Sequence, residues 1–190
     1  RSDRMHLIAD VGQPGPASPP GHIHADCLSF VLHVDGQPAI VDTGTSEYGS
    51  GPRRAHERST AAHNTIVVDR TDQTEVFGAF RAGRRARATL ERAEAAPDGS
   101  VEVAASHDGY RHLPGKPIHR RRWSVHQNTL TITDEVTGTG SHHLESHIHR
   151  PTIGGNTSEG TTQMAMDALE IEADPATEHT TNRCDLAAGF

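Results

Sequence analysis

Three residues of this sequence are of types that bind divalent metals, and they stand where strands are expected to begin or end. His24 precedes an apolar run, Asp42 follows the next such run, and His63 precedes a third. Two imidazoles and a carboxylate suit zinc, which keeps an open position in sites with three protein ligands. Manganese, iron or calcium are alternatives. These residues could form a metal site, but a His-x-His pair near a turn is often not a ligand, and the spacing alone does not favour the site.

His22 is the other member of the His-x-His pair. Residues two apart on an extended chain point to the same side, so the imidazoles of His22 and His24 could face one cleft. A free imidazole titrates near neutrality, which suits proton transfer. On the residues alone, a solvent-exposed loop histidine is the preferred interpretation of His22. Asp26 and Asn64 are candidates for orienting the ligand imidazoles.

A predicted hairpin brings these side chains together. Residues 27–34 (CLSFVLHV) have a strand pattern, Asp35-Gly36 is a hairpin turn signal, and residues 37–41 (QPAIV) form the returning strand. In an antiparallel pair, the start of one strand lies beside the end of the next. The spacing therefore predicts that His24 lies close to Asp42.

The rest of the chain favours an all-β fold. Further strands are expected at 65–69, 86–92, 100–106, 119–126, 129–135 and 142–149. Residues 43–60 have the composition of a polar loop, and no segment shows a sustained helical period. Many short strands separated by turns are typical of a sandwich or barrel, and we predict an antiparallel β-sandwich.

Composition limits the partners. Hydrophobic residues make up 33% of the chain and aromatic residues 4%, so the core must consist mainly of Val, Ile, Leu and Ala, which suit a sheet face. The net charge of −7 weighs against nucleic acid or an anionic membrane as partner. Arginine clusters at 81–87 and 120–122 are positively charged exceptions within this acidic chain. No run is long and apolar enough to span a bilayer. Cys27 and Cys184 are too few for a disulfide framework, and Cys27 is expected to be buried.

Three pieces of sequence in one order resemble the heparinase II/III-like family. They are GHIHADCLSF (21–30), VDTGT (41–45) and RSTAAHNTIVVD (58–69), and HDGY (107–110) and HRRRW (119–123) add support. The resemblance covers roughly residues 21–151. Several pieces in a fixed order are more specific than any one motif.

The resemblance implies a polysaccharide lyase. Family members pair an α-helical toroid with a β-sandwich and cleave acidic, uronic-acid-containing polysaccharides by β-elimination. By resemblance, His22 is catalytic in the cleft, whereas His24, Asp42 and His63 bind a structural zinc. The toroid of the parent protein is an expected partner, and the periplasm, cell envelope or exterior is the expected location.

Two further residues are candidates for substrate binding. Arg58 could pair with a substrate carboxylate in a bidentate manner, although a salt bridge within the fold is the commoner fate of such an arginine. Tyr48 could line the cleft, and a packing role is at least as probable a use of this side chain. His56-Glu57 stands where the family commonly has an aromatic pair, which leaves the local packing open.

The predicted organisation has three parts. Residues 1–20 are expected to be a linker or strand remnant, 21–151 the sandwich, and 152–190 its continuation or a partly ordered tail. The family's catalytic tyrosine comes from the helical domain, so this chain alone is expected to be incomplete as a lyase.

Two other functions remain open. One is a non-catalytic carbohydrate-binding or structural β-sandwich that retains zinc. The other is a cupin-like metalloenzyme, which would need a second histidine cluster formed by His142, His143, His147 and His149. For that cluster, an exposed polar face of an edge strand is the preferred interpretation.

Overall fold

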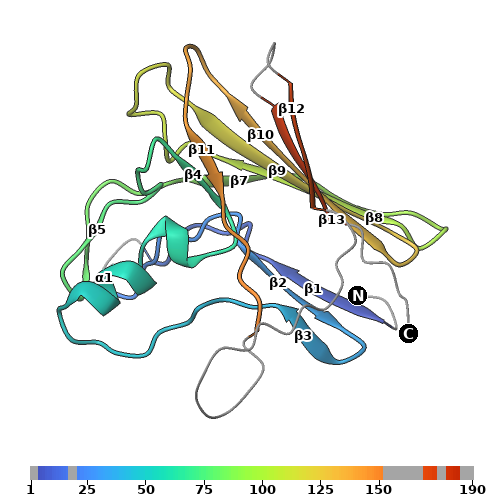
Figure 1. The fold of residues 1–190 in the computed structure, drawn as a ribbon, viewed down its shortest axis with the longest axis horizontal. Helices are drawn as coiled ribbons and strands as arrows, with labels where there is room; N and C mark the ends of the chain where they lie inside the picture. The colour runs from blue at the N-terminus through green and yellow to red at the C-terminus, as the bar shows by residue number, and fades with distance from the viewer. Residues whose placement is uncertain (1–3, 17–20, 152–168, 175–178, 185–190) are drawn as a thin grey trace.

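The structure is a computed structural model that describes residues 4–16, 21–151, 169–174 and 179–184 (Figure 1). The strands are β1 (Met5–Ala9), β2 (Phe30–Val34), β3 (Gln37–Ile40), β4 (Ile66–Val68), β5 (Val76–Phe77), β6 (Arg81–Ala82), β7 (Ala88–Ala95), β8 (Val101–His107), β9 (Ile118–His126), β10 (Thr129–Thr137), β11 (Leu144–Ser146), β12 (Leu169–Asp174) and β13 (His179–Cys184). The helices of these described ranges are α1 (Pro52–Glu57) and the 3-10 turn η1 (Thr60–Ala62).

The larger layer is a six-stranded antiparallel sheet. Its strand order is β12-β13-β10-β9-β8-β7. The β9–β10 hairpin pairs along its whole length and sets Arg121 opposite Asp134. The turn between them, Gln127-Asn128, contains Gln127 with a positive φ of 52°.

The smaller layer is a three-stranded sheet in the order β1-β2-β3. Its β2–β3 turn has φ values of 50° at Asp35 and 78° at Gly36. Positive φ at both central residues is the requirement of a tight hairpin turn whose twist matches its strands. The predicted Asp35-Gly36 hairpin is therefore confirmed.

The two layers pack face to face around one main core. The small sheet and the residues before it contribute Met5, Leu28, Phe30, Leu32 and Ile40, whereas the large sheet contributes Ala105, Trp123, Leu130 and Ile132. Figure 1 shows β1–β3 lying across from the large sheet, with β4, β11 and the helical segment at one end. The predicted antiparallel β-sandwich is confirmed, and Cys27 is fully buried, as expected.

Several elements differ from the sequence-based prediction. The polar loop at 43–60 contains α1, which is one and a half turns long and begins with Pro52; so short a helix leaves no periodic pattern to detect. Residues 1–20, expected to be a linker or strand remnant, include β1, which pairs with β2 along five residues. Residues 152–190, expected to continue the sandwich or to be a partly ordered tail, include β12 and β13, which extend the large sheet from β10. The strand expected at 142–149 is limited to β11. The domain boundaries themselves stay predictions.

No helix within the described ranges has the length and apolar character needed to cross a membrane.

Candidate metal centre and cleft histidine

The segment that carries the His-x-His pair has one polar and one buried side. Ile23, Ala25 and Cys27 are buried, whereas the residues that alternate with them, His22, His24 and Asp26, are not. The segment is tied to the helical region by a hydrogen bond from the Ala25 amide to the Arg58 carbonyl, at 3.0 Å. His24 and Asp26 therefore point away from the core on the same side of one segment.

His63 is held in a tautomer that can bind a metal. It follows η1, is 1% exposed, and its Nδ1 lies 2.7 Å from Asp42 Oδ2. A carboxylate accepts, so Nδ1 carries the proton and the lone pair of the neutral ring is on Nε2. That Nε2 atom is buried and has no hydrogen-bond partner. A buried nitrogen with a free lone pair is a place where a metal ligand is expected.

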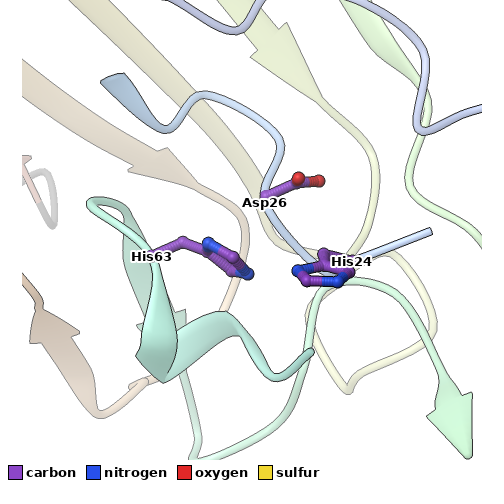
Figure 2. A group of neighbouring side chains, drawn as sticks. All are labelled: His24, Asp26 and His63. Atoms are coloured by element: carbon purple, nitrogen blue, oxygen red, sulfur yellow. The ribbon is translucent and has the colours of Figure 1, made fainter. Parts of the chain in front are cut away.

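His24, Asp26 and His63 form one group of neighbouring side chains (Figure 2). One donor atom from each of the three lies within 4.8 Å of the others, and the rings of His24 and His63 are 5.3 Å apart. Ligands around one zinc stand about 2.0–2.2 Å from the metal, so small side-chain shifts would bring these atoms into its shell. The set of two imidazoles and a carboxylate fits a divalent metal.

Asp42 occupies a different place from Asp26. It follows β3, and its Oδ1 accepts a hydrogen bond from the Gly44 amide at 2.8 Å while Oδ2 contacts His63. Burial acts to raise the pKa of Asp42, but the hydrogen bond and charge of His63 outweigh it and lower this pKa below its ordinary value. Thus the structure brings His24 and His63 together and sets Asp42 against the outer nitrogen of His63.

The electrostatics keep the imidazole of His24 neutral. Burial, followed by the charges of His63 and Arg54, lowers the pKa of His24 to about 4. Burial also raises the pKa of Asp26. A neutral imidazole is the form that binds metals, so His24 is ready to act as a ligand at neutral pH.

Arg54 is a site residue that the sequence analysis missed. It lies on α1, is 0% exposed, and its Nη1 is 3.2 Å from His24 Nε2 and 3.3 Å from Thr45 Oγ1. Its positive charge opposes a bound cation, and the carboxylates of Asp26 and Asp42 offset it. Because α1 was not predicted, nothing in the sequence indicated which of its arginines turns inward.

His22 lies in a group of rings beside the candidate metal centre. It is exposed, and its ring makes edge contacts with Tyr48 and Phe80, each at 5.9 Å between centroids. The Tyr48 ring stacks on Phe80 at 6.3 Å, and the guanidinium of Arg54 lies over Tyr48 at 5.4 Å. The structure therefore brings His22 and Tyr48 together, with Phe80 as a neighbour that the sequence did not single out.

Arg58 lies beneath this group and not on its surface. It is 1% exposed, and its guanidinium donates to the carbonyls of Ile23, Gly78 and Arg81 at 2.9–3.0 Å. It thereby joins the segment of His22 and His24 to the β5–β6 hairpin that carries Phe80. The fold uses these donors internally, and contact between Arg58 and a substrate stays a prediction.

The second histidine cluster is dispersed among separate partners. His142 contacts Asp69 at 2.8 Å, His143 contacts Glu145 at 2.9 Å, and His149 contacts the Ala61 carbonyl at 3.0 Å. The grouping of metal-binding side chains found in the described ranges is the one at His24, and it includes none of these histidines.

Comparison with known proteins settles the family. The family model described as "Heparinase II/III-like, C-terminal" matches residues 1–186, nearly the whole chain. The chain belongs to the heparinase II/III-like family. The match begins ahead of β1 and extends through β13, so it includes both layers of the heparinase II/III-like sandwich.

Individual relatives of this heparinase II/III-like domain are more distant. An alginate lyase of Stenotrophomonas maltophilia (strain K279a) is 26% identical over 100 residues, which are 47% of this chain and 13% of that protein. A heparinase III gene product superposes with a TM-score of 0.61 at 20% identity, over 85% of this chain and 23% of that one. A heparinase III crystal structure gives 0.52 at 17% identity, over 74% and 23%. These structural likenesses show the fold, and the chain spans only a small part of each relative.

Proposed function

We propose that this chain is the metal-binding β-sandwich domain of a polysaccharide lyase that cleaves uronic-acid-containing polysaccharide by β-elimination. The observation that carries the proposal is the convergence of His24, Asp26 and His63, in which the buried Nε2 of His63 has no other partner. Family membership, the relative named as an alginate lyase and the structural neighbour named as a heparinase III support the reaction class.

Zinc is the proposed metal, and another divalent metal is the alternative. His24 and His63 would supply nitrogen ligands. Asp26 is the carboxylate grouped with both imidazoles, whereas Asp42, the ligand implied by the family resemblance, holds Nδ1 of His63 and orients its ring. Bound there, the metal would act structurally, because it would tie the segment at 24–26 to the separate segment that ends in His63.

His22 is the proposed catalytic residue of this domain. Removing the proton next to a uronate carboxylate builds negative charge on that carboxylate, so the site must neutralise it. The exposed imidazole of His22 can donate a hydrogen bond to this charge or take part in proton transfer. Tyr48, whose side chain is 57% exposed and contacts His22, is the proposed substrate-binding neighbour.

The remaining catalytic groups would come from outside this chain. We propose that a helical toroid of the parent protein faces His22 and Tyr48 and completes the cleft. The substrate would be an acidic polysaccharide, and the site of action the periplasm, cell envelope or exterior.

Metal analysis tests the centre directly. The chain is purified without added metal, and bound metal is measured by elemental analysis beside His24→Ala, His63→Ala, Asp26→Asn and Asp42→Asn. We expect about one zinc per chain and its loss in both histidine variants. Replacing a residue that only orients a ligand is expected to lower metal affinity about 10–100-fold. Comparing Asp26→Asn with Asp42→Asn therefore shows which carboxylate binds the metal and which one orients His63. A folded wild-type chain without metal would contradict the proposed centre.

Activity is tested in the full-length parent. β-Elimination leaves an unsaturated uronate whose ultraviolet absorbance can be followed. We expect cleavage by the wild-type parent and its loss in His22→Ala, with zinc content unchanged. A parent protein that binds acidic polysaccharide without cleaving it would favour the non-catalytic binding module.

A further inference from the structure

One buried arginine of the large sheet contacts the backbone of the two segments that carry the candidate metal ligands. Arg121 lies on β9, is 0% exposed, and faces its neighbour Asp134 on β10. Its Nε and Nη2 donate to the two oxygens of Asp134 at 2.6 and 2.8 Å. This bidentate geometry fixes the plane of the guanidinium. The direction in which the remaining nitrogen, Nη1, points is therefore fixed as well.

Nη1 of Arg121 joins the two segments that carry the converging donors. It donates to the Leu28 carbonyl at 2.8 Å and to the Asn64 carbonyl at 2.5 Å. Leu28 lies two residues after Asp26, and Asn64 directly follows His63. Leu28 also has a positive φ of 62°, a conformation that leucine rarely adopts. One NH2 group thus holds both segments at a defined separation.

Asn64 extends this connection to the other parts of the centre. Its side-chain nitrogen donates to the carbonyls of Phe30, at 2.7 Å, and Val41, at 2.9 Å, the latter being the residue before Asp42. Its backbone amide donates to Ser29 Oγ at 3.0 Å. Asn64 therefore fixes the start of β2 and the end of β3 relative to His63.

A buried polar chain supports the arginine. The Gly109 amide donates to His107 Nδ1 at 3.1 Å, so His107 Nε2 carries the proton and donates to His119 Nδ1 at 3.1 Å. His119 Nε2 then donates to Asp134 Oδ1 at 2.7 Å. Every member has one possible tautomer, and the Phe30 and Trp123 rings lie 5.5 and 6.0 Å from the guanidinium. Several hydrogen bonds of one buried network therefore hold both Arg121 and Asp134 in place.

We propose that Arg121 and Asn64 are positioning residues that preorganise the metal centre, with Arg121 holding the segments of Asp26 and His63 and Asn64 adding the segment of Asp42. Neither touches the metal: both act through backbone carbonyls next to the ligands. The inference rests on the proposed metal centre. The inference explains why the fully buried guanidinium of Arg121 donates to two loop carbonyls as well as to Asp134 of its own sheet.

The test separates metal affinity from stability. Zinc affinity is measured by competition with a chromophoric chelator, at a temperature where circular dichroism shows each variant folded. Unfolding is measured separately without metal. Arg121→Lys keeps the charge beside Asp134 but lacks the planar fork, and Asn64→Ala removes the side-chain donors. The matched control is Ile132→Ala, which creates a cavity on β10 without removing a hydrogen bond to either loop.

We expect Arg121→Lys and Asn64→Ala to weaken zinc binding about tenfold or more, whereas Ile132→Ala loses stability but binds zinc like the wild type. If either positioning variant fails to fold, Ser29→Ala removes only the acceptor of the Asn64 amide and is expected to weaken binding severalfold. Wild-type affinity in the folded variants would overturn the inference and leave the metal centre standing. A wild-type chain that binds no zinc would overturn the metal centre itself.

Discussion

At the scale of single residues, buried arginines connect separate segments of the fold. Arg58, Arg54 and Arg121 are three arginines that the fold buries completely or almost completely. Each satisfies its guanidinium with carbonyls, a carboxylate or an imidazole of the fold. A buried charge is tolerated when its hydrogen bonds are made, and these arginines thereby link separate segments of the chain through hydrogen bonds.

Replacing Arg58 with methionine should destabilise the fold. The substitution leaves the buried carbonyl of Ile23 and the part-buried carbonyls of Gly78 and Arg81 without these donors. We expect the free energy of unfolding to fall by about 2–4 kcal/mol, measured by denaturant titration. The control is Arg53→Met, because Arg53 is 70% exposed and its pair with Glu57 is worth at most about 1 kcal/mol. Wild-type stability together with weaker polysaccharide binding by the parent would instead assign Arg58 to the substrate.

At the scale of elements, pairing partners decide what a short segment becomes. β1 lies in a stretch with no strong strand pattern. It is extended because it pairs with β2 along its whole length, from Met5 opposite Val34 to Ala9 opposite Phe30. α1 is stabilised in place by the contacts of Arg54 and Glu57. Elements of this kind depend on tertiary packing more than on intrinsic propensity.

Two adjacent residues of β1 test which face of this strand is buried. Leu7 packs against the main core, whereas Ile8 is 55% exposed on the other face. Leu7→Ser should lower the free energy of unfolding by about 1.5–3 kcal/mol, and Ile8→Ser should stay within about 0.5 kcal/mol of the wild type. Denaturant midpoints of the two variants provide the measurement. Equal losses would mean that β1 does not present Leu7 to the core.

At the scale of the whole molecule, the two layers are joined by apolar packing and by a buried polar chain. Burial, followed by the charge of His119, lowers the pKa of His107, and burial lowers the pKa of His119 despite its hydrogen bond to Asp134. Burial acts to raise the pKa of Asp134, but Arg121 and His119 outweigh it and hold this pKa below its ordinary value.

These shifts predict acid sensitivity in the metal-free protein. Below about pH 6.5 the unfolded state binds protons at His107 and His119, whereas the folded state does not because their pKa values are lowered. The contribution of the two histidines to the free energy of unfolding is therefore present above that pH and is lost as pH falls. Each buried histidine adds at most about 1.4 kcal/mol per pH unit, and Asp134 adds a loss in the same direction below about pH 4. Denaturant titrations from pH 7.5 to 5 with a chelator present measure the slope.

The matched variants for this slope are His107→Gln and His126→Gln. The first removes a fully buried imidazole and should make the dependence on pH shallower, whereas the second changes an exposed side chain at the end of β9 and should leave it as it was. A slope that is unaffected by His107→Gln would assign the acid sensitivity to other groups.

The amino-acid sequence by itself determined the all-β class, the β2–β3 hairpin and the family. Strand patterns, the Asp35-Gly36 turn and ordered motifs are local features of the chain, and they can be read without knowing what packs against them. The same patterns also selected His24 and His63, whose places beside strand ends follow from local spacing.

Only the tertiary structure decided which groups meet. Asp26 lies in one group with His24 and His63 while Asp42 contacts Nδ1 of His63, and Arg58 donates to backbone carbonyls, whereas its sequence position left both substrate contact and a role within the fold open. Arg121 and Asn64, 57 residues apart, meet because β9 packs behind the loop that follows η1. Such choices depend on side-chain direction and on burial created by distant segments, and no short stretch of sequence contains that information.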